Sequence, residues 1–405
     1  MASKAASRSL ALVDTHTKNK ALQGMAGALI EKKALIMKAN LKDLKFAKSK
    51  KLSSALIDRL TLSSARVDAM ARSLNEIAGL KDPIGDVIET IRRPNGLLIK
   101  KVRVPIGSIL VIYESRPNVT SDCIGLCLKS GNSVILRGGR EAINSNIAIF
   151  EVLNAEAKRC GIPDGAISIV RDTDRSIVWD LLKVSALIDL VIPRGGESLI
   201  REVTARSRIP VIKHYKGVCH TYVDASADLD MAGEICFNAK VQRPGVCNAM
   251  ETLLVSEDIA KDFLPWMIDR FRHAGVQIRG CPKTRKIAGS VVRKAVESDW
   301  YKEYLDLILS VRVVRGVDEA ITHIMKYGSY HSDAIDKFRA AKFLARVDSA
   351  CVYVNASTRF TDGSEFGKGA EIGVSTDKIH ARGPMGLEEL TSYKYVIYGN
   401  GQVRR

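Results

Sequence analysis

From residue 107 onward the chain alternates short, apolar, β-rich runs with helix-compatible stretches, and this alternation constrains its fold more than any other feature. Such a pattern is typical of βαβ units, in which parallel strands are connected by helices that cover the sheet. The expected strands of a first series are 108–113, 133–136, 167–170, 187–192 and 210–213. A second series follows, with strands expected at 251–255, 307–314 and 351–355 and helices at 229–240, 257–274 and 318–327. The sequence therefore predicts an α/β fold with two doubly wound lobes.

The segment before this alternation has a different character. Apolar residues at Leu22, Met25 and Leu29 share one helical face, and a similar spacing at 67–78 predicts a second buried helix. Two β-rich runs, 87–91 and 97–104, then flank a Pro-Asn-Gly turn and predict a hairpin. Because an isolated hairpin is marginally stable, we expect this small β element to pair with further strands, including those of a partner subunit.

These patterns predict three regions. Residues 1–213 contain the N-terminal helices, the first α/β series and, at 87–104, the hairpin expected to support oligomerisation. Residues 214–375 form the second lobe, and residues 376–405 return to the first with a β-rich tail at 393–398. The stretch 356–384 is rich in Gly, Ser and Thr, and so long an irregular segment in a compact enzyme is usually functional.

Composition narrows the class of protein. Hydrophobic residues make up 46% of the chain, but no apolar run approaches the roughly 20 residues that span a bilayer. The eight cysteines show no CxxC spacing, which favours reduced thiols. The N-terminus has no apolar stretch typical of a secretion signal. We therefore expect a cytoplasmic protein without a membrane partner.

The formal charge of +17 raises the possibility of a nucleic-acid-binding protein. Against it, the basic residues are interleaved with acids along the chain. The densest cluster, 45–51, falls where we expect a connection between two helices, and no zinc-finger or helix-turn-helix pattern accompanies it. We therefore expect no nucleic-acid partner, although phosphate groups of a small ligand would suit part of this charge.

Cys247 follows a Pro-Gly turn between an expected helix and an expected strand. Such a turn presents a side chain to a cleft, and a neighbouring positive charge such as Arg243 would favour the reactive thiolate. The alternative is a buried structural thiol.

Asn118 follows directly on the first strand of the alternating region. Side chains beyond the carboxyl end of a parallel strand are where open α/β sheets bind ligands. An amide N–H at this place suits stabilisation of an oxyanion, and the alternative is a cap for the following helix.

Two Arg-Gly-Gly turns, at Arg137-Gly138-Gly139 and Arg194-Gly195-Gly196, come at the ends of expected strands. Glycine lets backbone amides approach a phosphate, and arginine adds a charged fork. We expect these turns to contact a cofactor. His214 and His220 flank Cys219, but further ligands at metal-binding spacing are lacking, so we predict no metal site.

Four segments together resemble one known family. YESRPNVT at 113–120, LKSGNSVILRGG at 128–139, NAKVQRPGVCNAMETLLV at 238–255 and the stretch 353–395 closely resemble the γ-glutamyl phosphate reductases, also called glutamate-5-semialdehyde dehydrogenases. The likeness extends over nearly the whole chain from about residue 10. This family belongs to the aldehyde dehydrogenase superfamily, so the resemblance implies a cofactor-binding domain, a catalytic domain and a small oligomerisation element.

The resemblance also implies roles for particular residues. Cys247 matches the superfamily nucleophile, and Asn118 matches the asparagine of its oxyanion hole. Arg137 matches a contact to the adenosine ribose and Glu303 a contact to the nicotinamide ribose. The implied reaction is the NADPH-dependent reduction of γ-glutamyl phosphate to glutamate 5-semialdehyde and phosphate, the second step of proline synthesis, through a Cys247 thioester.

One departure from the wider superfamily bears on the direction of the chemistry. Aldehyde-oxidising members place a glutamate about 33 residues before the cysteine to activate hydrolytic water, and here that register holds His214. A reductase that acts on an acyl phosphate needs no such water, so the substitution favours reduction. The remaining alternatives are an aldehyde-oxidising member of the superfamily and a non-catalytic basic scaffold.

Four residues are suggested for the substrate. Arg359 and Asn355 lie in the irregular segment that the resembling family uses near its active site, and Arg243 or Arg116 would hold the acyl phosphate by charge complementarity. The alternative is that the three arginines form salt bridges that only stabilise loops. A homo-oligomer is expected, and a glutamate 5-kinase that hands over the labile acyl phosphate is a candidate partner.

Overall fold

The computed structural model describes residues 1–335 and 340–404, and contacts within the chain divide it into two compact units. Unit 1 comprises Met1–Lys213, Gly367–Gly373 and Met385–Arg405, of which Arg405 is not described. Unit 2 comprises His214–Phe366 and Val374–Pro384. The first boundary falls between residues 213 and 214. Towards the C-terminus, the chain alternates between the units instead of returning to the first one once.

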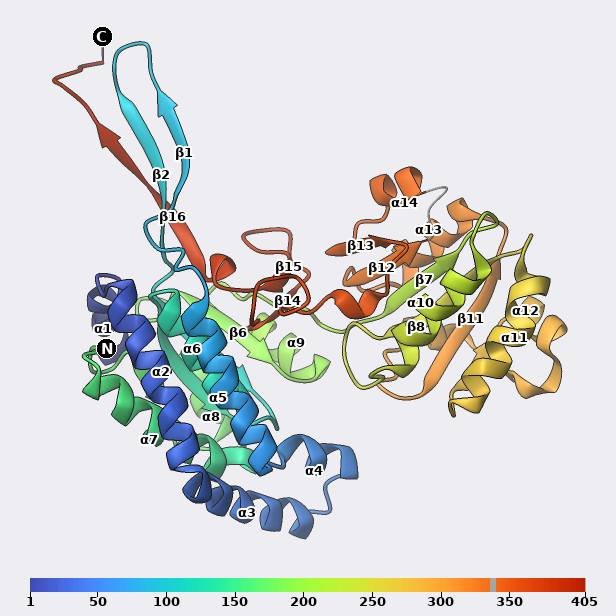
Figure 1. Ribbon diagram of the computed structural model, residues 1–405, viewed down its shortest axis with the longest axis horizontal. Helices are drawn as coiled ribbons and strands as arrows, with labels where there is room; N and C mark the ends of the chain where they lie inside the picture. Colours follow the sequence, from blue (N-terminus) through green and yellow to red (C-terminus); the bar gives the residue numbers. More distant parts are fainter. Residues whose placement is uncertain (336–339, 405) are drawn as a thin grey trace. The chain divides into compact units, whose positions relative to one another are not determined.

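Unit 1 begins with five helices that precede the first strand of the alternating region (Figure 1). The predicted faces are buried: Leu22 and Leu29 are inaccessible to solvent, as is Leu74. The basic cluster at 45–51 lies mostly within the third helix, so the expectation of a helix connection there is wrong. The helices are α1 (Ala2–Leu10), α2 (Thr15–Glu31), α3 (Lys33–Ser49), α4 (Ser54–Leu60) and α5 (Ser64–Gly79).

A four-stranded parallel sheet with the order β5-β4-β3-β6 forms the centre of unit 1. Alternate residues of the first strand face opposite sides: Leu110 and Ile112 pack with Val178 and Val203 of the helices after β5 and β6. The elements are β3 (Ser108–Tyr113), α6 (Asn118–Lys129), β4 (Ser133–Gly138), η1 (Arg140–Ala142), α7 (Ile143–Arg159), β5 (Ile167–Ile169), α8 (Arg175–Leu181), β6 (Leu190–Arg194) and α9 (Glu197–Arg206).

The predicted hairpin is confirmed as β1 (Val87–Arg92) and β2 (Leu98–Pro105), which pair antiparallel. The C-terminal strand β16 (Thr391–Tyr398) pairs antiparallel with β2 and completes a three-stranded arm (Figure 1). Apolar side chains on the arm are at least 45% exposed: Val87, Ile88, Tyr393, Tyr395, Ile397 and Tyr398.

Unit 2 contains a seven-stranded parallel sheet with the order β10-β9-β11-β8-β7-β12-β13. One apolar cluster joins it to α10 and α11, and another joins it to α13 and α14, so helices cover both faces. Its elements up to the fifth strand are β7 (Cys219–Val223), α10 (Leu229–Val241), β8 (Met250–Ser256), α11 (Ala260–His273), β9 (Gln277–Gly280), α12 (Pro282–Ala288), η2 (Gly289–Val291), β10 (Arg293–Lys294), η3 (Glu297–Tyr301) and β11 (Ile308–Val314).

The remaining elements of unit 2 are α13 (Val317–Tyr327), β12 (Ser332–Ile335), α14 (Ala340–Arg346), β13 (Cys351–Val354) and η4 (Thr358–Phe360). β14 (Gly373–Ser375) and β15 (Gly383–Met385) each include a boundary between the units along the chain, and η5 (Glu388–Leu390) belongs to unit 1. The predicted α/β class with two doubly wound lobes is thus confirmed. The strand expected at 210–213 is wrong: only Val211 forms an isolated bridge there, to Val191. Among the described residues, no helix has the length and apolar character needed to cross a membrane.

Candidate active site

Cys247 lies in the loop that joins α10 to β8, in the position that the sequence predicts. Its side chain is partly exposed, whereas the other cysteines are buried, apart from Cys160. The next residue anchors the loop: the Asn248 side-chain amide donates to the carbonyl of Thr361 (2.8 Å), and the Thr358 hydroxyl donates to the Asn248 carbonyl (2.8 Å). A buried anchor beside an accessible thiol holds the sulfur in place while leaving it open to a small substrate.

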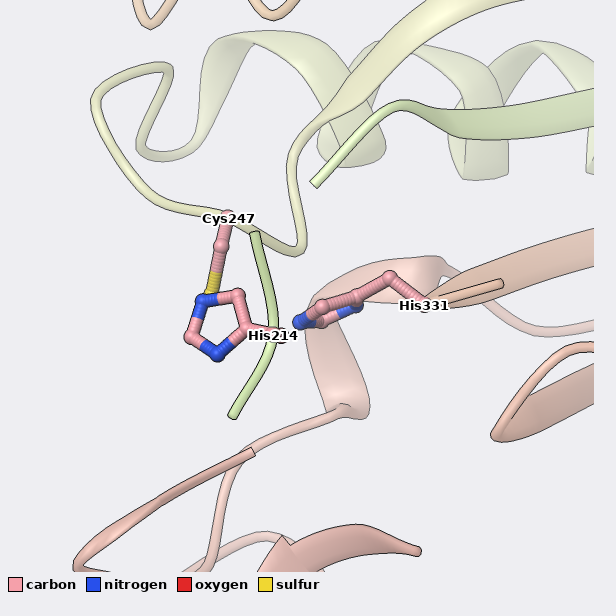
Figure 2. A group of neighbouring side chains, drawn as sticks. All are labelled: His214, Cys247 and His331. Atoms are coloured by element: carbon pink, nitrogen blue, oxygen red, sulfur yellow. The ribbon is translucent and has the colours of Figure 1, made fainter. Parts of the chain in front are cut away.

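Two histidines lie beside this thiol (Figure 2). One ring nitrogen of His214, one of His331 and Sγ of Cys247 all lie within 4.8 Å of one another. The strand order explains how residues so distant in sequence meet. Cys247 precedes β8, His214 precedes β7 and His331 precedes β12, and these three strands are neighbours in the order β8-β7-β12. The cluster therefore lies at the amino ends of parallel strands.

Hydrogen bonds fix both imidazole rings. Nδ1 of His214 lies 2.8 Å from the carbonyl oxygen of Val374, and because a carbonyl only accepts, this nitrogen carries the proton. Nδ1 of His331 lies 2.9 Å from the hydroxyl of Ser332. The two rings meet edge to face, with centroids 5.6 Å apart. Nε2 of His214 is therefore the nitrogen that can take a proton from the thiol, while the Ser332 hydroxyl holds Nδ1 of His331.

His220, by contrast, belongs to a separate buried group. Its Nδ1 and its backbone N–H both lie 2.9 Å from Oδ1 of Asp333. In place of Cys219 and His220, the residues that come together with His214 are Cys247 and His331.

Arg359 is tied to the loop of the thiol. Its Nε donates to Oε1 of Gln242 (2.8 Å), and one terminal nitrogen donates to the side-chain oxygen of Asn248. Burial lowers the pKa of Arg359, and the positive charge of Arg243 lowers it further. Arg243 is exposed, so two guanidinium groups adjoin the loop that carries Cys247. This local excess of positive charge suits a doubly charged phosphate.

The other two predicted substrate residues have different settings. Asn355 follows β13 in a left-handed conformation (φ 53°), and its side-chain oxygen is buried with no hydrogen-bond partner among the described residues. Arg116 is exposed in the loop between β3 and α6, in unit 1.

Asn118 is the first residue of α6. The alternative that it caps this helix is wrong, because Pro117 occupies the capping position. The Asn118 side-chain amide instead donates to Oδ2 of Asp122 (3.0 Å). Burial raises the pKa of Asp122 to about 6, while hydrogen bonds from Asn118 and Ser73 oppose the shift. The amide of Asn118 is thus exposed but oriented by a carboxyl group one turn further along the helix.

Unit 1 contains a cavity of about 420 Å3 beyond the ends of its sheet. Arg137 and Gly139 of the first Arg-Gly-Gly turn line it, together with Arg140, Arg175 and Trp179. Arg137 is buried and donates to the carbonyl oxygens of Gly138, Thr173 and Asp174, and burial lowers its pKa. Its Nε has no hydrogen-bond partner among the described residues, so it is a donor that a ligand would satisfy.

Neighbouring side chains pack closely on the two glycines of this first turn. A Cβ atom at Gly138 would lie 2.1 Å from the Asn146 side chain, and one at Gly139 would lie 2.2 Å from the Glu141 carboxylate. A polar cavity lined by arginines and glutamates, with a close-packed glycine turn, has room for part of a dinucleotide.

The second Arg-Gly-Gly turn has a partner within the protein. Gly196 is the N-terminal cap of α9, and its N–H donates to the carboxylate of Glu114 (3.0 Å). A Cβ at Gly195 would lie 2.5 Å from the same carboxylate. Arg194 ends β6, and its carbonyl accepts from the Glu114 backbone. The turn is thus held against the end of β3.

Glu303 lies in unit 2, on the loop between η3 and β11. One carboxylate oxygen accepts from the backbone N–H of Gly217 (2.9 Å). Gly217 also packs on the Cys247 backbone, since a Cβ there would lie 1.8 Å from the Cys247 carbonyl oxygen. Glu303 and the thiol loop therefore share one glycine as a neighbour.

The loop that carries Glu303 is supported by a buried ion pair between Lys240 and Glu251, which the sequence did not predict. Nζ of Lys240 lies 2.7 Å from Oε2 of Glu251, and both side chains are inaccessible to solvent. Burial raises the pKa of Glu251 and lowers that of Lys240. The other oxygen of Glu251 accepts from the backbone N–H groups of Tyr304 and Leu305, directly after Glu303. In the sequence, the only sign of this pair is a lysine near the end of an expected helix and a glutamate in the apolar strand that follows it.

Comparison with protein families places the chain in a class. Residues 1–309 match the model of the aldehyde dehydrogenase family. Since this match covers more than half of the chain, the protein belongs to the aldehyde dehydrogenase family and is an oxidoreductase.

Close relatives then define the group within that family. A γ-glutamyl phosphate reductase of Thermodesulfovibrio yellowstonii is 57% identical over 405 residues, covering 99% of this chain and 97% of the relative. One of Caldanaerobacter subterraneus subsp. tengcongensis is 58% identical over the same length. The crystal structure of the Thermotoga maritima γ-glutamyl phosphate reductase has a TM-score of 0.97 at 48% identity, covering 100% of this chain and 98% of the other. This chain is a member of the γ-glutamyl phosphate reductase family.

A more distant structure shares only the fold. An engineered glycolyl-CoA reductase with bound NADP+ has a TM-score of 0.70 at 13% identity.

Proposed function

We propose that this protein reduces the γ-acyl phosphate of glutamate to glutamate 5-semialdehyde and phosphate, with Cys247 as the covalent nucleophile. The observation that carries the proposal is the accessible Cys247 thiol between two fixed histidines, in a chain 57% identical over 405 residues to a γ-glutamyl phosphate reductase. This reaction is the second step of proline synthesis.

The first step forms a thioester. The Cys247 sulfur attacks the acyl carbon, the bond from that carbon to the phosphate oxygen breaks, and phosphate leaves with the electron pair. His214 takes the thiol proton at Nε2, because its Nδ1 already donates to the Val374 carbonyl. A separation of up to 4.8 Å exceeds a hydrogen bond, but such contacts commonly tighten only when substrate is bound.

Charge complementarity places the leaving phosphate with Arg359 and Arg243. The Arg359 guanidinium interacts electrostatically with both the Arg243 charge and the Cys247 thiol. Asn118 donates its amide N–H to the carbonyl oxygen as negative charge develops there, and Asp122 orients that amide. Arg116 and Asn355 are left to contact the amino-acid end of the substrate.

The second step needs a nicotinamide cofactor, which supplies the hydride that converts the thioester carbon to the aldehyde level. The cavity of unit 1 would hold the adenosine part through Arg137 and the turn at Gly138 and Gly139. Arg194, Gly195 and Gly196 would lie towards the phosphates, and Glu303 would hold the nicotinamide ribose. Collapse of the resulting thiohemiacetal breaks the carbon–sulfur bond and returns the Cys247 thiolate.

We further propose that the cofactor is NADPH. Arg140 and Arg175 line the cavity together with Arg137, so guanidinium groups are available for a phosphate there, beside the carboxylates of Glu114, Glu141 and Glu202. NADPH differs from NADH by a 2′-phosphate, and arginine binds phosphate with two parallel hydrogen bonds.

Two wider proposals concern the setting of the enzyme. The exposed apolar side chains of the arm support a homo-oligomer in which β1, β2 and β16 pair with a second subunit. The free thiols of the chain are compatible with work in the cytoplasm, where a glutamate 5-kinase would supply the labile acyl phosphate.

The test uses the reverse reaction, because the acyl phosphate is unstable. Protein, glutamate 5-semialdehyde in equilibrium with its cyclic imine, NADP+ and phosphate are mixed, and formation of NADPH is followed by absorbance. The expected result is NADPH formation that requires phosphate and is lost in Cys247→Ala. Steady turnover without phosphate would contradict acyl-phosphate chemistry and indicate an aldehyde-oxidising enzyme instead.

A further inference from the structure

We propose that Cys247, His214 and His331 together bind a thiophilic divalent cation of the Zn2+ type, and that this cation holds the nucleophile in an inactive state. The inhibitory part rests on the proposed function, because it takes Cys247 to be the nucleophile. The binding part rests on the geometry of the three side chains alone.

The separation of the ligand atoms suits such an ion. All three lie within 4.8 Å of one another. Zinc takes a thiolate sulfur at about 2.3 Å and an imidazole nitrogen at about 2.0–2.1 Å, which sets ligand atoms about 3.5 Å apart in a tetrahedral site. The required contraction is small, and the Cys247 side chain is partly exposed, so the protein does not enclose the thiol. Figure 2 shows the thiol and both rings converging from separate segments.

The surroundings of the rings match those of metal-binding histidines. In such sites the second ring nitrogen is held by a carbonyl, a carboxylate or another polar group, which fixes the tautomer and the ring. Here Nδ1 of His214 is held by the Val374 carbonyl and Nδ1 of His331 by the Ser332 hydroxyl. Ser332 is in turn held by the Thr361 hydroxyl at 2.6 Å. Both rings thus offer Nε2 as the ligand.

The ligand set selects the kind of ion. One thiolate and two neutral imidazoles are soft or borderline ligands, which favour Zn2+ over Mg2+ or Ca2+. Three protein ligands leave the fourth position of a tetrahedral ion to water or to a phosphate oxygen. Binding releases the thiol proton to solvent and requires no redox partner.

Metal binding and catalysis exclude each other at this site. The sulfur lone pair that attacks the acyl carbon is the pair donated to the metal. A bound ion also occupies Nε2 of His214, the atom proposed to take the thiol proton. Occupancy therefore removes both the nucleophile and its base in one reversible step.

The direct test is a titration of the full-length protein with Co2+, which reports its ligands in the visible spectrum. We expect about one equivalent to bind per chain, with the d–d bands of a tetrahedral ion and a thiolate-to-cobalt charge-transfer band. Cys247→Ser should lose the charge-transfer band. His331→Gln, which preserves the approximate size of a buried side chain, should weaken binding at least tenfold.

A matched control is Cys160→Ala combined with His273→Ala, a thiol and an imidazole outside the cluster, which should leave the titration unchanged. Circular dichroism shows whether each variant is folded. If His331→Gln binds Co2+ as the unaltered chain does, or if the charge-transfer band survives Cys247→Ser, the proposed site is wrong.

A second measurement follows Zn2+ and activity. Stoichiometric Zn2+ should protect Cys247 from alkylation by iodoacetamide and stop turnover. Addition of EDTA should reverse both effects. Alkylation that proceeds at an unchanged rate under saturating Zn2+ would overturn the proposal. Cobalt binding and alkylation are measured without substrate, so a protein that binds metal but does not reduce the acyl phosphate would contradict the proposed function and leave the metal site standing.

Discussion

At the scale of single residues, the buried pair of Lys240 and Glu251 determines how the loop after Glu303 is held. Both charges are inaccessible to solvent, and Glu251 also accepts two backbone N–H groups of that loop. Removing one member of a buried pair leaves the other charge uncompensated, which costs far more than the loss of an exposed pair.

We therefore predict that Glu251→Gln lowers the free energy of unfolding by about 3–5 kcal/mol. The matched control is Glu257→Gln, which breaks an exposed pair with Lys283 and should cost less than about 1 kcal/mol. Urea denaturation of both variants measures the difference. Equal effects of the two substitutions would contradict a role of the buried pair in stability.

Asp122 provides a test that depends on pH. Burial raises its pKa to about 6 in the folded protein, so the folded state binds this proton more tightly than the unfolded state does. The associated stability is fully present below the unfolded pKa near 3.9 and is lost as the pH rises through about 6. Such a difference in pKa corresponds to about 3 kcal/mol, and because Asp122 is only partly buried we expect about 2 kcal/mol.

The prediction concerns the difference between Asp122→Asn and the unaltered chain. Between pH 4 and pH 7, the variant should gain about 2 kcal/mol of unfolding free energy relative to the unaltered chain, since asparagine does not ionise. Urea denaturation at several pH values measures this. A difference that is constant over the whole range would show that Asp122 titrates with an ordinary pKa.

At the scale of elements, the arm of β1, β2 and β16 has the exposed apolar surface that is typical of a subunit interface. Its strands carry tyrosines and aliphatic side chains that are largely exposed in a single chain. We predict that Tyr395→Asp combined with Ile397→Asp prevents formation of the proposed homo-oligomer while each subunit stays folded, because charged side chains would oppose burial of this surface. Light scattering after gel filtration measures the mass.

The control for the arm is Ile379→Asp, which changes an 86% exposed side chain of unit 2 and should leave the mass unchanged. If the unaltered chain is a monomer, or if the double substitution leaves its mass unchanged, the arm has another role.

Some strands could be predicted from the sequence and others could not, depending on whether they contain buried polar residues. Continuous apolar runs such as 108–113 identified β3 and β8, because central parallel strands are buried on both faces. β7 and β12 were missed because they contain His220 and Asp333, which are buried as a hydrogen-bonded pair across the two strands. A polar pair of this kind is satisfied only by tertiary structure and leaves no apolar run in either segment.

At the scale of the whole molecule, the division of the chain at residue 214 follows from two independent parallel sheets, each with its own apolar core. Sequence patterns and resemblance led to Cys247, whereas His331 was not predicted. Its approach to the thiol depends on β12 lying beside β7, and that strand order is set by contacts between distant segments. The net charge of +17 remains without a structural explanation.

The proposed reaction requires Cys247 to carry the substrate as a thioester that phosphate releases. The most direct measurement mixes the protein rapidly with glutamate 5-semialdehyde and NADP+ in the absence of phosphate. We predict a burst of about one NADPH per active site and, by intact mass spectrometry, a glutamyl adduct on Cys247 that disappears when phosphate is added. Either of two results would contradict a Cys247 thioester: no burst and no adduct from folded protein that binds NADP+, or an equal burst from Cys247→Ala.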